Sequence, residues 1–465
     1  MSLLAIKSHV LFRNSNLRLV WLSQIISQMG DKIFQLALIW WILNQGFENS
    51  GLLLGILLVS SVTPAVILKS SIARVIASSP MKRLLQSLDL GGLAVSAALC
   101  LLLFSLFGGG QDQGDPSYLL YSVLVVSNLL FSCCQAFIGP TLNASVSKVS
   151  DPEDLEGAVS MLSSATTVAQ IMGAVAGAVL LEALGLTGVV ILNALTFLIS
   201  FGLDSSLRIQ ANDQNSQVSP NETTIPSDTS KPSPGAWTDR LPHLKKLLLV
   251  FAAVNLFGTP ILVLLPLYIQ QSFGGEASRL ALSEGVLSFG ILMGTLLTSF
   301  ISKTLTKGVS ELRLVSLCLA LFGLGLGLVS LPKSFSLFCL VLLVTTFTLG
   351  LMNVKMLTYF QTHLGEGDKA DFFAHLQSRV LVAVPIGYFL FGTASDYLAV
   401  QSLSLVQGTA ILGLSGVAFW IARSHEGSKR ADTAPTDLLT AKLSESETET
   451  EQALAFSTRP EGSVP

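Results

Sequence analysis

Twelve long apolar stretches occupy most of this chain of 465 residues, and they restrict what it can fold into. A helix needs about 20 apolar residues to cross about 30 Å of hydrocarbon, where the backbone must satisfy its own hydrogen bonds. Half of the residues are hydrophobic and only 12% are charged, which is typical of a membrane protein. We therefore predict an all-α membrane protein with twelve transmembrane helices. The predicted spans are residues 19-43, 51-69, 84-107, 118-141, 157-181, 186-207, 247-269, 281-302, 312-331, 335-361, 377-397 and 402-423.

The basic residues predict how the chain is oriented. All but four of the 27 Lys and Arg residues lie before the first span, within or at the edge of every second gap after it, or within or at the edge of the tail. Cytoplasmic loops of membrane proteins carry an excess of Lys and Arg, so this distribution predicts that both termini are cytoplasmic. The basic loops are explained by topology and by lipid headgroups, and we expect the lipid bilayer, not nucleic acid, as the surrounding partner. The four exceptions are Arg279 and Lys333 on the opposite side, and Lys32 and Lys355 within spans.

A polar segment divides the spans into two sets of six. Residues 209-243 are rich in Asn, Asp, Gln, Ser, Thr and Pro, so we expect a flexible cytoplasmic linker there. The predicted parts are a six-helix half over 1-208, this linker, a second half over 244-424, and a disordered cytoplasmic tail over 425-465. Two halves of this kind are typical of transporters that bind substrate near the bilayer midplane.

The first span carries a polar stripe. Gln24, Gln28, Asp31 and Gln35 are separated by four, three and four residues, which places them on one helical face. Asp31 lies near the middle of the span, where an ionisable group costs at least about 2.5 kcal/mol unless it faces protein or water. Two interpretations stay open: Asp31 binds a proton, a coupling cation or substrate, or it belongs to a structural buried pair. Lys32, about 100° around the helix, either flanks the same cavity or pairs with an acid elsewhere.

Other spans offer weaker polar candidates for the same cavity. Asn128 and Gln135 are seven residues apart in the fourth span, hence on one face, and Gln170 lies in the fifth. Asn255 in the seventh span precedes a Gly-Thr-Pro sequence, where the proline frees a backbone carbonyl and favours a kink. Lys355 in the tenth span lies in the cytoplasmic half and is as readily explained by snorkelling to the interface.

The sequence contains no signature of an enzyme. It has no nucleotide-binding P-loop and no zinc-binding HExxH motif, and its five histidines are scattered over termini and loops. The five cysteines lie in apolar spans without metal-ligand spacing. We expect neither catalytic activity nor a cofactor, so that any transport would draw on an ion gradient or on the gradient of the substrate itself.

Two segments carry a family resemblance: FRNSNLRLVWLSQIISQMGDKIFQLALIWW, and GPTLNASVSKVSDPEDLEGAVSMLSSATTVAQIMGAVAGAVLL across the fourth and fifth spans. They resemble the major facilitator superfamily, and within it the bacterial drug and macrolide efflux branch that includes siderophore exporters. The resemblance implies an alternating-access transporter of a bacterial cytoplasmic membrane, with a small-molecule substrate and protons or another coupling ion as partners. It also places Asp31 at an acidic position common in the first helix of these exporters.

The loop between spans two and three departs from the family pattern. The signature, approximately G-x-x-x-D-R-x-x-R-R, is reduced here to a basic end at Lys82 and Arg83 and a downstream Asp89, with Arg74 in the region of the missing acid. The resemblance implies that this loop gates transport, but the acid that usually latches one conformation is absent. The fifth span likewise lacks the proline and final glycine of the antiporter signature G-P-x-x-G-G.

We therefore expect a secondary transporter that exports an amphipathic small molecule by proton exchange. Two alternatives stay open. The chain could be an uptake permease, because the fold does not set the direction of transport. It could also be a transporter-like protein without transport activity that assists membrane assembly or lipid handling, which the altered loop signature favours.

Overall fold

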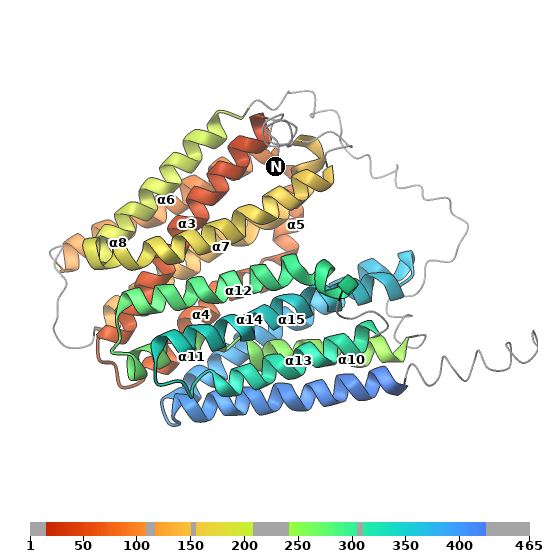
Figure 1. Ribbon diagram of the computed structural model, residues 1–465. Coiled ribbons are helices and arrows are strands. Elements are labelled where there is room, and N and C mark those ends of the chain that lie inside the picture. Colours follow the sequence, from red (N-terminus) through yellow and green to blue (C-terminus); the bar gives the residue numbers. More distant parts are fainter. Residues whose placement is uncertain (1–14, 108–116, 150–154, 208–240, 305–309, 425–465) are drawn as a thin grey trace, which may run out of the picture.

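The computed structural model describes residues 15–107, 117–149, 155–207, 241–304 and 310–424. Every regular element in these ranges is a helix. The predicted tail and nearly all of the predicted linker lie outside the described residues, and the second half begins with a helix at Pro242. The helices of the first half and those of the second half form two bundles, drawn in red to yellow-green and in green to blue in Figure 1.

The first bundle contains α3 (Ser15–Asn44), α4 (Ser50–Ile67), the short α5 (Lys69–Ser78), α6 (Met81–Phe107), α7 (Tyr118–Val149) and α8 (Leu155–Ser205). The second contains α10 (Pro242–Gly258), α11 (Ile261–Ser272), α12 (Ala277–Thr304), α13 (Glu311–Leu328), α14 (Phe335–His363), α15 (Glu366–Ser395) and a final helix over Val400–Ser424.

Two elements differ from a plain succession of spans. α8 runs through the region of two predicted spans and is kinked at Gly185, whose φ of 64° only glycine adopts readily. α10 and α11 together form one stretch of 31 residues that is broken at Thr259 and Pro260, where the kink was expected. Proline interrupts the helical hydrogen bonds at this point.

Ten helical stretches among the described residues are long and apolar enough to cross a membrane, which supports a multi-pass membrane protein. α3 is not one of the ten, and it is the helix that carries the polar stripe. The number of twelve transmembrane helices therefore stays a prediction.

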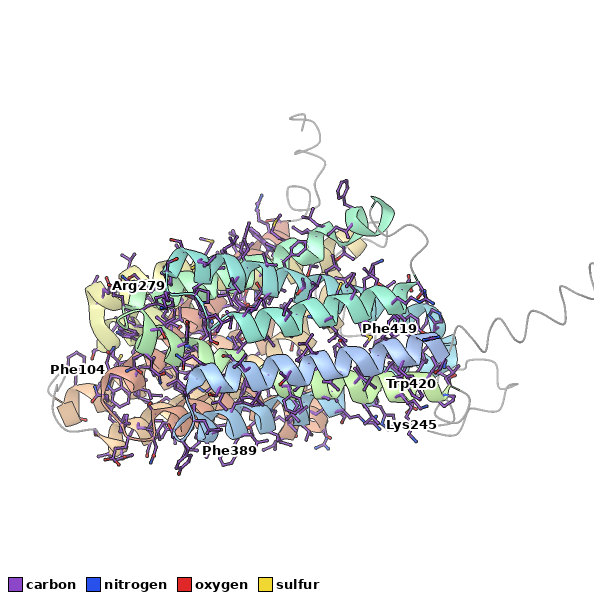
Figure 2. The ribbon with its side chains drawn as sticks, turned by 60° about the horizontal axis from the view of Figure 1, so that its bottom comes forward. Phe104, Lys245, Arg279, Phe389, Phe419 and Trp420 are labelled. Atoms are coloured by element: carbon purple, nitrogen blue, oxygen red, sulfur yellow. The ribbon has the colours of Figure 1, made fainter. Side chains whose placement is uncertain are left out.

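Large apolar side chains cover the outside of the bundles. Phe104, Phe389, Phe419 and Trp420 project outward in Figure 2 and are about half exposed, as expected for side chains that meet lipid tails. Lys245 and Arg279 lie toward opposite ends of the bundle in the same view. This agrees with their predicted positions on opposite sides of the membrane.

The two bundles approach most closely where α4 packs against α15. A Cβ atom added at Gly55 would lie 2.8 Å from the carbonyl oxygen of Tyr388, so the two backbones are in direct contact. Small residues permit this kind of close helix packing in membranes. Beside it, the Asp396 carboxylate accepts hydrogen bonds from the backbone N–H groups of Gly51 (2.8 Å) and Leu52 (2.9 Å). It thereby satisfies free amides at the positive end of α4.

We predict that Gly55→Val destabilises the protein by about 1–3 kcal/mol, because the added side chain must push the two backbones apart. The measurement is chemical and thermal unfolding of the purified protein in detergent. Gly413→Val is the matched control, since a Cβ at Gly413 meets nothing within 4 Å, and its effect should stay within about 0.5 kcal/mol. Equal effects of the two substitutions would contradict the close contact between α4 and α15.

Candidate functional site

A polar cavity of about 220 Å³ lies within the first half, beside α3. Two phenylalanines and nine polar or charged residues line it, and they come from α3, α4, α7 and α8. The lining residues are Gln28, Asp31, Lys32, Phe34, Gln35, Ser61, Asn128, Phe131, Ser132, Gln135 and Gln170. The structure thus brings together most of the candidates that the sequence analysis selected from separate spans.

The Asp31 carboxylate is held by side-chain amides from two other helices. Gln135 of α7 donates a hydrogen bond to one carboxylate oxygen, and Asn193 of α8 donates to the other at a distance of 3.5 Å. Gly30 allows this arrangement, because a Cβ atom there would meet the side chains of Asn193 and Thr196. The Asp31 carboxylate therefore has neutral hydrogen-bond donors as its bonded neighbours.

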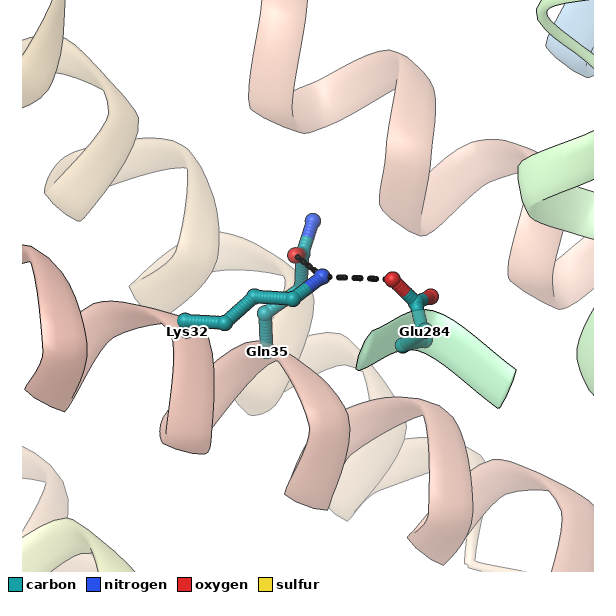
Figure 3. A network of polar contacts seen from close by, with 3 residues as sticks. All are labelled: Lys32, Gln35 and Glu284. Carbon is teal, nitrogen blue, oxygen red and sulfur yellow. Dashed lines mark hydrogen bonds and ion pairs between the residues drawn. The ribbon is translucent and has the colours of Figure 1, made fainter. Parts of the chain in front are cut away.

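Lys32 has a different partner, which lies in the other half of the protein. Its Nζ is 2.9 Å from Oε2 of Glu284 on α12, and it also donates to Oε1 of Gln35 at 3.2 Å (Figure 3). The side chains of Lys32 and Glu284 are only 14% and 3% exposed. Both sequence-based interpretations of Lys32 therefore hold in this structure, since it lines the cavity and also pairs with an acid.

Asn128 lines the cavity and also joins two helices through its side-chain amide. Its side-chain amide donates to the Leu57 carbonyl at 3.2 Å and lies 2.7 Å from Oγ of Ser60 and 2.9 Å from Oγ of Ser61. These bonds tie α7 to α4 and fix one wall of the cavity.

Two predicted site residues lie outside this cavity. Gln24 is 2% exposed and accepts a hydrogen bond from the Gln28 amide at 3.1 Å. It therefore helps to orient Gln28, which lines the cavity. Asn255 lines a second cavity of about 200 Å³ within the second half. Apolar side chains such as Phe322 and Met352 make up most of that lining, and the Asn255 amide donates to the Phe251 carbonyl of its own helix.

The residues predicted for the gating loop have different surroundings. Arg74 of α5 and Arg83 of α6 are exposed. Lys82 donates hydrogen bonds to the carbonyls of Ser205 (2.7 Å) and Leu207 (2.8 Å) at the end of α8, where a cation is favourable. Asp89 is not a loop residue, since it lies in the third turn of α6 and is 4% exposed.

Sequence reasoning missed Glu284 and Asn193. Glu284 lies three residues inside the predicted span over 281-302, and an acid at that position is itself a signal. Asn193 lies in the middle of an apolar run and resembles any other isolated amide, so its contact with Asp31 requires the fold.

The chain belongs to the Major Facilitator Superfamily, whose sequence profile matches residues 20–378. Solved structures with this fold include a bacterial homologue of the iron transporter ferroportin in an inward-facing state. It is 17% identical, with coverage of 90% of this chain and 99% of that one and a TM-score of 0.64. A bacterial homologue of the human lysosomal transporter Spinster, inward-facing and occupied, is 13% identical, with coverage of 88% and 96% and a TM-score of 0.64.

A peptide transporter in complex with sulfate is 11% identical, with coverage of 88% of this chain and 95% of that one and a TM-score of 0.64. Comparison with curated protein sequences finds no match. At these identities the solved structures establish a shared fold. Together with the family, they indicate a transporter rather than an enzyme.

We predict that Glu284→Gln destabilises the folded protein by about 1–3 kcal/mol, because it leaves the Lys32 ammonium buried without its counter-charge. The double variant Lys32→Gln/Glu284→Gln should recover part of that loss. A double-mutant cycle measured by unfolding in detergent isolates the coupling energy.

Glu276→Gln is the matched control for this cycle. The Arg279–Glu276 pair has a similar separation, 3.0 Å, but its side chains are 36% and 55% exposed. Exposed pairs contribute at most about 1 kcal/mol. A coupling energy for Lys32 and Glu284 no larger than that of the exposed pair would show that the buried pair does not hold the halves together.

Proposed function

We propose that this protein is a secondary active transporter that exports an amphipathic small molecule in exchange for protons. In this proposal twelve helices cross a bacterial cytoplasmic membrane, and both termini are cytoplasmic. The function resembles that of the drug, macrolide and siderophore exporters. The observation that carries the proposal is the Asp31 carboxylate, placed in the wall of a polar cavity and bonded to amides rather than to a cation.

Asp31 is the proposed proton carrier. The amides of Gln135 and Asn193 each have a donor and an acceptor end, so reorientation lets them bond to either the charged or the protonated carboxyl. The neighbouring Lys32 does not neutralise Asp31 permanently, because its ammonium is held by Glu284. A carboxyl of this kind can release its proton when a substrate with a positive or strongly polar group enters the cavity.

The linings support an amphipathic substrate. The first cavity offers amides, a carboxylate and an ammonium together with the rings of Phe34 and Phe131. The second cavity, in the other half, is mainly apolar. Ligand sites of transporters and other proteins combine an apolar surface with a few placed polar groups in this way.

The contacts between the halves support alternating access. The halves are joined at the end where α3 ends and α4 begins. There the Asp396 carboxylate accepts hydrogen bonds from backbone amides of α4, and the Gln270 side chain donates one to the Leu43 carbonyl. With cytoplasmic termini, this end is the outer one, so the proposed state is closed to the outside. Export requires these contacts to open while the contacts near the other end form.

Asp31→Asn is predicted to abolish proton-coupled transport, because the amide cannot bind and release a proton. Inverted membrane vesicles energised with an inside-acid pH gradient are supplied with amphipathic fluorescent amines and macrolides, and accumulation is measured. Exchange of substrate across the membrane without a pH gradient should persist in Asp31→Asn, since it needs no net proton movement.

Glu48→Gln is the control, because Glu48 is an exposed acid in the loop that follows α3. This variant should transport like the unaltered protein. Normal gradient-driven accumulation by Asp31→Asn would remove Asp31 as the proton carrier. Accumulation driven in the opposite direction would favour an uptake permease. The absence of flux and exchange for every compound in the unaltered protein would favour a non-transporting membrane protein.

A further inference from the structure

A pair of buried acids lies within the first half, and neither acid lines the cavity. Asp89 of α6 is 4% exposed and Asp204, at the end of α8, is 1% exposed. The two carboxylates are close enough to repel each other. Two hydroxyls lie next to them, with Ser200 beside Asp89 and Ser23 beside Asp204. Three helices, α3, α6 and α8, therefore contribute oxygen atoms to one buried cluster.

These oxygen atoms are unsatisfied. Among the described residues, Oδ2 of Asp89, both carboxylate oxygens of Asp204 and Oγ of Ser200 are buried and form no hydrogen bond of standard geometry. Ser23 donates its hydroxyl proton to the Val20 carbonyl at 3.0 Å, which leaves its oxygen lone pairs available. Buried carboxylates are costly unless a positive group compensates them. The local structure thus provides oxygen ligands without a matching number of donors.

The charges around the pair define what would compensate it. Lys82 is the basic residue that acts on Asp204, and its Nζ also binds the carbonyls of Ser205 and Leu207. When both acids are ionised, two carboxylates and one ammonium leave a single negative charge, and Asp31 adds negative potential from the cavity side. One monovalent cation would therefore balance the site. Carboxylate and hydroxyl oxygens are the ligands that hard cations prefer.

A shared proton fits these atoms less well than a metal cation. One proton joins two oxygen atoms, whereas the site presents at least four unsatisfied or available oxygens from three helices. A small cation can be ligated by all of them at once. The thiol of Cys134 on α7 also lies within electrostatic range of Asp89, and it supplies no positive charge.

The acid pair is connected to the cavity by a row of buried polar groups. On α8, Asn193, Thr196, Ser200 and Asp204 are spaced by three, four and four residues and share one face. On α3, the buried Ser23 and Ser27 precede Asp31 at four-residue intervals. The hydroxyl of Ser27 also has no partner in the described part of the chain. A cation at the acid pair would therefore influence the charge state of Asp31 through a polar, not an apolar, interior.

We propose that Asp89 and Asp204, with the hydroxyls of Ser23 and Ser200, form a binding site for one Na⁺ ion inside the first half. The site is distinct from the substrate cavity. It goes beyond the proposed function, and the cation binds there whether or not Asp31 carries protons.

The test uses the full-length protein purified in detergent without sodium. Binding of radioactive Na⁺ is measured by titration, and the unfolding temperature is compared in NaCl, KCl and choline chloride at equal ionic strength. We expect saturable binding of one Na⁺ per chain and stabilisation that is specific to Na⁺. Asp89→Asn and Asp204→Asn should each abolish the binding. Ser200→Ala, a smaller change that should leave the fold intact, should weaken it by about tenfold or more.

Two control variants separate this site from its surroundings. Asp31→Asn removes the acid in the cavity and should weaken Na⁺ binding only slightly, because Asp31 contributes negative potential but no ligand to the site. Glu182→Gln removes an exposed acid on α8 and should bind Na⁺ like the unaltered protein. The proposal is overturned if the unaltered protein shows no Na⁺-specific binding or stabilisation. It is also overturned if Asp89→Asn, Asp204→Asn and Ser200→Ala bind normally, or if Asp31→Asn alone removes the binding. None of these outcomes depends on measuring transport.

Discussion

The ion pair between Lys32 and Glu284 is the interaction on which the arrangement of the two halves depends. Inside a membrane protein a charged side chain needs a partner or water, because lipid provides neither. Lys32 finds its partner in the other half, at 2.9 Å, while the adjacent Asp31 is bonded within its own half. Two consecutive residues of α3 therefore perform different tasks: one links the halves, and the other presents a carboxylate to the cavity.

Packing between backbones adds a second constraint at the end of the interface. Gly51, Gly55 and Gly392 bring α4 and α15 into contact, and Asp396 supplies the carboxylate that binds the amides of α4. Contacts of this kind are discrete: they are either formed at full complementarity or lost, because packed interfaces deform little. A protein in which such contacts form at one end when they are lost at the other can switch between two states by rigid-body movement of its halves.

The sequence could predict the polar stripe but not its partners. Helical periodicity alone placed Gln28, Asp31 and Gln35 on one face, and the structure puts all three in the cavity wall. The partner of Lys32 is separated from it by 252 residues, and no local pattern encodes such a distance. Only the packing of α3 against helices from both halves determines which amide or acid each residue meets.

Other differences have equally local causes. The predicted break in the seventh span suggests that Asn255 lines the same cavity as Asp31, yet in the structure it lines a cavity of its own half. Asp89 was assigned to a loop by its nearness to Lys82 and Arg83, but α6 starts at Met81 and carries Asp89 into the interior. The number of membrane crossings is hard to read from hydropathy, because polar residues inside a helix such as α3 lower its apolar signal.

The most direct test of this account is a pair of distance measurements by pulsed electron paramagnetic resonance in lipid nanodiscs. Spin labels replace Glu48 and Tyr397 at one end, and Ser78 and Gln361 at the other, with the five native cysteines replaced; all four labelled positions are exposed and each pair spans both halves. We expect Lys32→Gln/Glu284→Gln to lengthen the first distance and to shorten the second, as alternating access requires. Unchanged distances at both ends, or changes in the same direction, would contradict it.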